Sequence, residues 1–305
     1  MIVFATADKG GSGRSVTLAN VAYRAALQGT DVCYLDFDFG SPTAGSTFSL
    51  SKVALGTSDG GLHSYLLGES ADFQRVDVWS ASDRSDLRLR PAGAGRLVLA
   101  PGDAGGGEFF AAQDVVRRCT QLLLAADEEF DVCLVDLSAG RSYTADMVLA
   151  ASASAELRNV TWRWLVFHRW TAQHLRAASG LVFGGRGLLE QSRLSGHDPS
   201  RLERALRFVS AAVVRPEGAE AAAATSAFAA WQAERDGALH EFAARVGLGR
   251  STRIASIPQE PMLQWVEQVI VDDDVLTRRI AQPAIIEAYE ALAARLSDDA
   301  AWEAP

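Results

Sequence analysis

A glycine-rich segment near the N-terminus holds the residues with the most specific chemistry. An apolar run at 2–6 leads into it, and a helical pattern begins at Ser15. Glycines let successive backbone N–H groups turn toward one anion, and the N-terminus of a helix adds a favourable potential. The hydroxyl of Ser15 stands where it could coordinate Mg²⁺. The segment therefore predicts a phosphate-binding loop, rather than a turn without a ligand, made of Lys9, Gly10, Gly11, Ser12, Gly13, Arg14, Ser15 and Val16.

Three carboxylates follow at the ends of two apolar runs. Asp36 and Asp38 alternate at the end of one run, and Asp136 ends the other. Carboxylates on alternate residues at the carboxyl end of a parallel strand face the crevice in which ligands usually bind. We expect Asp36 and Asp38 to face that crevice, although a strand-end turn needs no catalytic reason for its aspartates.

Short β-branched runs alternate with longer helical patterns. This alternation predicts a doubly wound α/β fold, with a mostly parallel sheet and helices on both faces. We expect one domain over 1–297 and a short, frayed acidic tail at 298–305. The expected strands are 2–6, 31–36, 96–100, 132–137, 162–168, 207–214 and 252–257, and the expected helices are 15–28, 107–129, 172–183, 219–246 and 262–296.

The loop resembles the deviant Walker A loop of the ParA/MinD family of P-loop ATPases, and its arginine resembles an actinobacterial variant of that loop. The resemblance implies that Lys9 reaches across a nucleotide-bound dimer to the phosphates of the partner subunit. It also implies that Asp38 positions the attacking water and that Asp36 helps to hold the lysine. The cofactors that it implies are ATP and Mg²⁺.

Two later segments extend the resemblance. Residues 130–140 resemble the Walker B strand and the switch after it, which implies that Asp136 lies near the water shell of the metal and that the N–H of Gly140 lies near the γ-phosphate. Residues 256–261 resemble the late loop that contacts adenine, which implies base contacts for Pro258 and Gln259. The asparagine that family members usually carry after the preceding strand is not evident.

Arg14 stands where P-loop proteins carry a lysine. An arginine keeps the positive charge, but it is a longer, planar fork. We expect nucleotide binding to be at least partly retained and hydrolysis to be slow or absent. The alternative is a tolerated drift from lysine, because 27 of the 29 basic residues in this chain are arginine.

The composition is that of an ordinary globular protein. The chain has 305 residues, 48% hydrophobic and 22% charged, and three cysteines, an odd number that cannot close a disulfide framework. No run approaches the ~20 apolar residues of a membrane span. The net charge of −9 argues against non-specific DNA binding, and the acidic C-terminal residues lack the face of a membrane-targeting helix. We expect a cytoplasmic protein.

Three functions remain open. The first is a nucleotide-dependent dimerisation switch, in which an unknown protein partner reads a homodimer formed through the nucleotide face. The second is a degenerate P-loop scaffold that no longer uses nucleotide. The third is an enzyme of the same fold that uses ATP for synthesis, for which no additional group of residues is evident.

Overall fold

Eight strands form one sheet in the order β3-β4-β2-β5-β1-β6-β7-β8. The structure is a computed structural model that describes residues 1–214 and 226–303. Neighbouring strands are parallel except for β3, which runs antiparallel to β4 at one edge. The predicted doubly wound fold is therefore confirmed. The strands are β1 Ile2–Ala7, β2 Val32–Phe37, β3 Val76–Asp77, β4 Leu97–Ala100, β5 Val132–Leu137, β6 Trp162–Arg169, β7 Leu206–Val213 and β8 Arg253–Pro258.

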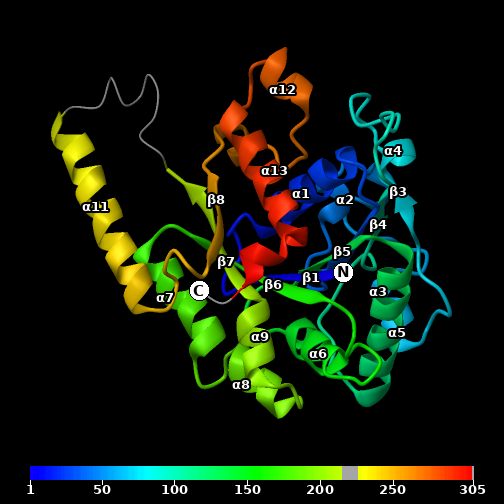
Figure 1. Ribbon diagram of the computed structural model, residues 1–305. Coiled ribbons are helices and arrows are strands. Elements are labelled where there is room, and N and C mark those ends of the chain that lie inside the picture. Colours follow the sequence, from blue (N-terminus) through cyan, green and yellow to red (C-terminus); the bar gives the residue numbers. More distant parts are fainter. Residues whose placement is uncertain (215–225, 304–305) are drawn as a thin grey trace.

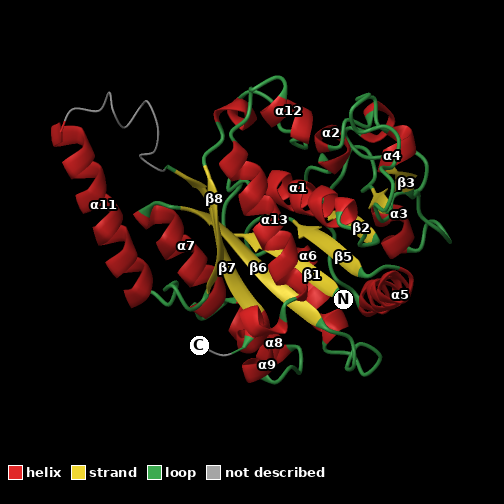
Figure 2. Ribbon diagram, turned by 45° about the horizontal axis from the view of Figure 1, so that its top comes forward, coloured by secondary structure: helices red, strands yellow, loops and turns green. Residues whose placement is uncertain are grey.

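Helices cover both faces of the sheet (Figures 1 and 2). Val3 of β1 belongs to a hydrophobic cluster with Leu18 and Leu292, from the helices of one face. Its neighbour Phe4 belongs to a second cluster with Leu122, from the other face. Successive side chains of a strand point to opposite faces, so a central strand covered on both faces is a continuous apolar run. For that reason all seven predicted strands are confirmed to within one residue at each end, while the two-residue edge strand β3 was not predicted.

The helices within the described residues are mostly short connections around a few long ones. Those of ten or more residues are α1 Arg14–Leu27, α5 Gln113–Glu129, α6 Tyr143–Ser152, α7 Ala172–Phe183, α11 Ser226–Arg245 and α13 Pro283–Ser297. The shorter ones are α2 Ala44–Thr47, η1 Ser51–Val53, α3 Leu62–Leu67, α4 Val78–Ala81, α8 Leu188–Leu194, α9 Pro199–Ala205, η2 Pro261–Gln264, α12 Asp272–Leu276 and η3 Asp299–Trp302. No helix in these ranges is both long and apolar enough to cross a membrane.

Four of the five expected helices have a counterpart among the described residues. The helix expected at 15–28 is α1, and the one at 172–183 is α7 with the same bounds. The helix expected at 107–129 begins later, at Gln113. The described part of the helix expected at 219–246 is α11, and positions 219–225 of that prediction lie outside the described residues.

The helix expected at 262–296 is wrong, because this segment folds as η2, an irregular stretch, α12 and α13. Pro283 suits the first turn of α13 but would break a helix that ran through it. The apolar residues before α12 are buried in irregular backbone that the side chain of Asn20 binds. It accepts the N–H of Ile270 at 2.8 Å and donates to the carbonyl of Gln268 at 3.1 Å.

The C-terminal residues are more ordered than the sequence indicated. The expectation of a frayed tail is wrong for residues 299–302, which form η3. Trp302 is buried, and its indole N–H donates to the carbonyl of Arg295 at 2.8 Å. The guanidinium of Arg163 lies 4.7 Å from the centre of its ring. Burial of the tryptophan ring stabilises this segment, and its acidic neighbours oppose that burial little because their side chains stay in water.

Candidate functional site

The glycine-rich loop lies at the carboxyl ends of three central strands. It joins the end of β1 to the start of α1 (Figure 1). β1 pairs with β5, and β5 pairs with β2, in a register that places Asp136 beside both Ala5 and Asp36. Asp38 directly follows β2. The loop and the three carboxylates are thus brought to one edge of the sheet, where open α/β sheets usually bind ligands.

Two glycines give the loop its shape. Gly11 and Gly13 have φ angles of 69° and 77°, in the left-handed region that glycine adopts without steric cost. The carbonyl of Gly13 accepts the N–H of Thr17 at 3.0 Å and so opens α1. Gly10, Gly11 and Gly13 are exposed, and a Cβ at Gly10 or Gly11 would meet no atom within 4 Å. The loop is therefore open to solvent at the N-terminus of a 14-residue helix, as a phosphate-binding loop must be.

Arg14 is buried between two carboxylates. Its Nε donates to Oδ1 of Asp136, and its Nη2 donates to Oδ2 of Asp38 at 2.8 Å. The same Nη2 lies 3.2 Å from Oγ of Ser15. Burial lowers the pKa of Arg14, but the charges of Asp136 and Asp38 outweigh that effect and leave the pKa raised. The guanidinium is therefore a permanent cation in the centre of the site.

Tyr34 completes the surroundings of Asp136. Its phenol, fully buried on β2, donates to Oδ2 of Asp136 at 2.7 Å. Burial, followed by the charge of Asp136, raises the pKa of Tyr34 well above its usual value, so it stays a neutral donor. Because Arg14 holds the other oxygen, both oxygens of Asp136 accept a hydrogen bond from this chain. Tyr34 was not singled out in the sequence, although it lies two residues before Asp36 on the same strand face.

Asp36 shapes the loop that carries Asp38. It is buried, and its oxygens accept the backbone N–H groups of Ala44 at 3.1 Å and Asp38 at 3.3 Å. Burial and then the charge of Asp136 raise the pKa of Asp36 well above its usual value. Burial also raises the pKa of Asp38, against the opposing charge of Arg14. The two aspartates thus differ in position, since only Asp38 reaches the guanidinium.

The loop after β5 is tied to the glycine-rich loop. The N–H of Gly140 donates to the carbonyl of Ala7 at 2.7 Å. Arg141 lies 3.5 Å from the carboxylate of Asp8 and donates to two carbonyls of the α7–α8 region. Arg141 was not predicted, because its partner Asp8 lies 133 positions earlier and no local pattern signals the contact. The N–H of Gly140, which was expected near the γ-phosphate, therefore binds the end of β1 in this structure.

The remaining predicted residues are spread around this edge of the sheet. Lys9 is half-buried, and its charge adds to burial in lowering the pKa of His174 on α7. Ser12 and Val16 are buried, and Ser15 is half-buried. Pro258 ends β8, three strands from β1, and the N–H of Gln259 donates to the carbonyl of Val213 at 2.9 Å.

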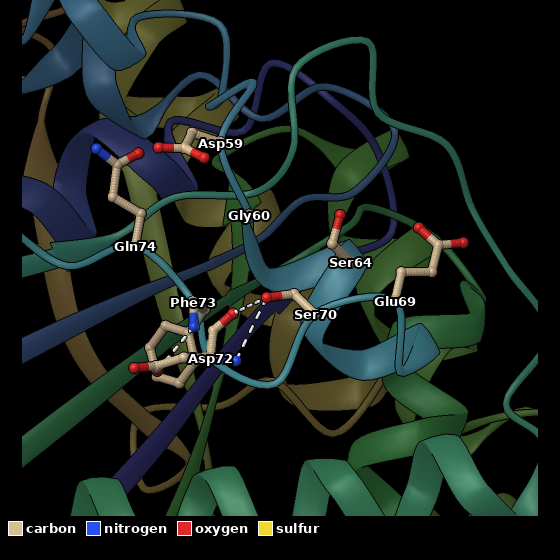
Figure 3. A pocket seen from close by; sticks show the side chains of 8 residues that line it. All are labelled: Asp59, Gly60, Ser64, Glu69, Ser70, Asp72, Phe73 and Gln74. Carbon is tan, nitrogen blue, oxygen red and sulfur yellow. Dashed lines mark hydrogen bonds between the residues drawn. The ribbon is translucent and has the colours of Figure 1, made fainter.

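A separate hollow lies away from the loop, beside α3 (Figure 3). Its volume is about 380 Å³, and three carboxylates line it, from Asp59, Glu69 and Asp72. A hydrogen bond within this segment joins two of the lining residues: Ser70 Oγ donates to the carbonyl of Asp72 at 2.6 Å. Within 1–214 and 226–303, no group of three or more histidine, cysteine, aspartate or glutamate side chains is arranged to hold a metal ion. This hollow is therefore an acidic surface feature.

Nearly the whole chain is similar in structure to solved cell division and plasmid partition proteins. MinD cell division protein from Aquifex aeolicus is 17% identical, with a TM-score of 0.60 over 97% of this chain and 96% of that one. The septum site-determining protein MinD from Pyrococcus horikoshii OT3, solved with Mg-ADP, is 14% identical, with a TM-score of 0.57 over 98% of each chain. A protein described as a plasmid partition protein from Borrelia burgdorferi B31, solved with AMPPNP, is 12% identical, with a TM-score of 0.54 over 95% and 96%.

The other comparisons gave no relative. No protein-family model matches the sequence, and no curated protein matches it significantly. At identities of 12–17%, structural similarity establishes the fold and leaves the activity to be argued from the site. The resemblance carried by the loop and the strand-end aspartates is nevertheless accompanied by structural similarity along nearly the whole chain. This chain therefore has the doubly wound α/β fold of the ParA/MinD-type P-loop ATPases.

Proposed function

We propose that the chain is a ParA/MinD-like ATP-binding protein that acts as a nucleotide-dependent dimerisation switch and hydrolyses ATP slowly or not at all. An open loop with two left-handed glycines at a helix N-terminus supports nucleotide binding. Lys9 and Arg14 place two cations in or beside that loop. A protein partner would bind the dimer in preference to the monomer.

The salt bridge between Arg14 and Asp38 carries the proposal of impaired hydrolysis. In this fold Asp38 is the carboxylate expected to prepare the attacking water. Its Oδ2 instead accepts from Arg14 at 2.8 Å. A carboxylate oxygen that already accepts a charge-assisted hydrogen bond from a guanidinium is less available to accept one from an attacking water. The nucleophile would then lack its orienting group, and misplacement by ~1 Å costs about 100-fold in rate.

The surface around the loop supports dimerisation through the same edge. Phe110 and Tyr143 follow β4 and β5, and they are 72% and 47% exposed. The rings of Phe110 and Tyr143 meet edge to face at 5.9 Å. Exposed aromatic side chains that gather on one side of a protein are typical of an interface. A second copy placed there would bring its Lys9 toward the bound nucleotide.

The mass of the protein in solution tests the switch. We expect ATP to raise the dimer fraction of the wild type, measured by light scattering after gel filtration, and Lys9→Ala to stay monomeric while still binding nucleotide. Lys52→Ala, which removes the other lysine at an exposed position, is the matched control and should behave as the wild type does. A dimer fraction that does not respond to nucleotide contradicts the proposal.

The second candidate is a scaffold that no longer uses nucleotide. Two groups that were expected to contact the nucleotide or its metal already have hydrogen-bond partners within this chain, which favours the scaffold. They are the carboxylate of Asp136 and the N–H of Gly140. A scaffold of this kind would show no nucleotide-dependent change in mass or stability. The same experiment therefore separates the two candidates.

A further inference from the structure

The fold implies a Mg²⁺ ion beside the phosphates. Whether this chain can bind that ion depends on whether its expected ligand groups are free. P-loop proteins hold the ion with the hydroxyl at the end of the loop and with a strand-end aspartate, often through water. In this chain those groups are Ser15 and Asp136, with Asp38 nearby. Mg²⁺ requires near-octahedral oxygen ligands at about 2.1 Å, so these groups would have to be free to turn toward it.

One side chain already contacts all three groups. Arg14 donates from Nε to Asp136 and from Nη2 to Asp38 at 2.8 Å, and its Nη2 lies 3.2 Å from Ser15 Oγ. The side chain is 6% exposed, and it therefore belongs to the interior of the site. The second oxygen of Asp136 is held by Tyr34 at 2.7 Å.

These residues do not fit a divalent cation. A metal bound between Ser15 and Asp136 would lie against a guanidinium that keeps its charge at every physiological pH. Like charges at such distances repel strongly when both are buried. Displacing Arg14 would leave the guanidinium buried without the two carboxylates that now pair with it, and a buried unpaired charge is severely destabilising.

We propose that the guanidinium of Arg14 takes the place of the divalent cation in this site, so that the site needs no Mg²⁺ to bind nucleotide phosphates. The part that concerns nucleotide rests on the proposed function, while the replacement of the metal does not. Arginine suits this task because its planar fork can contact two acceptors at once and is less strongly hydrated than an ammonium group. Lysine, with one compact charge, cannot bridge the same groups.

A metal titration without nucleotide tests the replacement. Mn²⁺, whose free form is counted by electron paramagnetic resonance, should not bind the wild type measurably at this site. Arg14→Met should bind it at least about tenfold more tightly, because the variant leaves Asp38 and Asp136 without a counter-charge, a difference of about 1.4 kcal/mol. Arg117→Met, at an exposed position of α5, is the control and should match the wild type.

If Arg14→Met does not fold, the Mn²⁺ titration of the wild type still tests the proposal. Binding of one Mn²⁺ per chain to the wild type, abolished by Asp136→Asn, would overturn the proposal. Absence of such binding, with Arg14→Lys gaining it, would support the proposal, since lysine keeps a positive charge but leaves one carboxylate free.

Nucleotide binding with and without metal tests the remaining part. A fluorescent ATP analogue should bind the wild type with a Kd that changes by less than about threefold between excess Mg²⁺ and EDTA. A tenfold or greater gain with Mg²⁺ contradicts the inference and leaves the proposed function intact. Failure to bind in both conditions contradicts the proposed function, while the Mn²⁺ titration still decides whether Arg14 replaces the metal.

Discussion

Arg14 and Asp38, which lie 24 positions apart, form a salt bridge at 2.8 Å in the centre of the candidate site. Arg14 is the first residue of α1, and Asp38 lies in the loop after β2. The carboxylate that the resemblance assigns to the attacking water is thus paired with the arginine of the glycine-rich loop before any ligand enters. The consequences can be tested by changing each partner.

Arg14→Lys should raise the rate of ATP hydrolysis. The shorter side chain with one compact charge restores the P-loop cation and releases Asp38 to orient water. We expect an increase of about 10- to 100-fold, measured as phosphate release at saturating ATP with Mg²⁺ present. Arg117→Lys should have no effect, and Asp38→Asn should remove the gain in the Arg14→Lys background. An unchanged rate in Arg14→Lys would show that Arg14 does not limit hydrolysis.

Tyr34→Phe should destabilise the fold although it removes only one oxygen. The phenol donates at 2.7 Å to a carboxylate that is itself buried. Loss of a buried hydrogen bond to a charged group costs about 1.5–3 kcal/mol. Urea unfolding measures the free energy, and Tyr143→Phe, an exposed tyrosine, should change it by less than about 0.5 kcal/mol. Equal stability of the two variants would mean that Asp136 finds another donor.

Acidification should destabilise the protein through His168. This side chain at the end of β6 is 2% exposed, and burial lowers its pKa to about 4. An unfolded histidine takes up a proton below pH 6.5, whereas the folded one stays neutral until about pH 4, so the unfolded state binds more protons between these values. Stability is therefore full above pH 6.5 and falls as the pH drops toward 4, by at most about 3 kcal/mol.

The difference between the wild type and His168→Asn isolates this effect. Urea unfolding at several pH values should give a shallower decline of stability with falling pH for His168→Asn than for the wild type. Parallel curves for His168→Asn and the wild type would rule out His168 as the group that titrates.

Asn20→Ala should weaken the attachment of the segment before α12. Asn20 is fully buried, and its amide binds the backbone of Gln268 and Ile270. Its removal leaves two backbone groups without partners, at about 1–3 kcal/mol each. Hydrogen exchange should show faster exchange at Ile270, with less change in β1. Protection at Ile270 equal to that of the wild type would contradict this interpretation.

The strands and the glycine-rich loop could be predicted because their signals are contiguous. The continuous apolar runs of β1 and β5 follow from burial on both faces, and the loop is one unbroken string of residues. The residues that the prediction missed act through distant partners. Arg141 meets Asp8 across 133 positions, and Tyr34 meets Asp136 across 102. No local pattern reports such contacts.

The incorrect helix at 262–296 has the same origin. Its apolar residues have the pattern of a helical face, but their burial depends on Asn20, about 250 positions away, which binds irregular backbone. The prediction for Arg14 had a different limit. The substitution was visible in the sequence, yet only the fold shows that the guanidinium contacts Asp38, Asp136 and Ser15 together.

Titration of the wild type with a fluorescent ATP analogue is the most direct measurement of whether this site uses nucleotide. Saturable binding in the micromolar range, lost in Gly13→Ala because a side chain is strained at a φ of 77°, is the expected result. Gly237→Ala, on α11, where a Cβ meets no atom within 4 Å, should retain binding and serves as the control. No binding of the wild type at millimolar nucleotide would contradict a nucleotide-dependent switch and leave the scaffold.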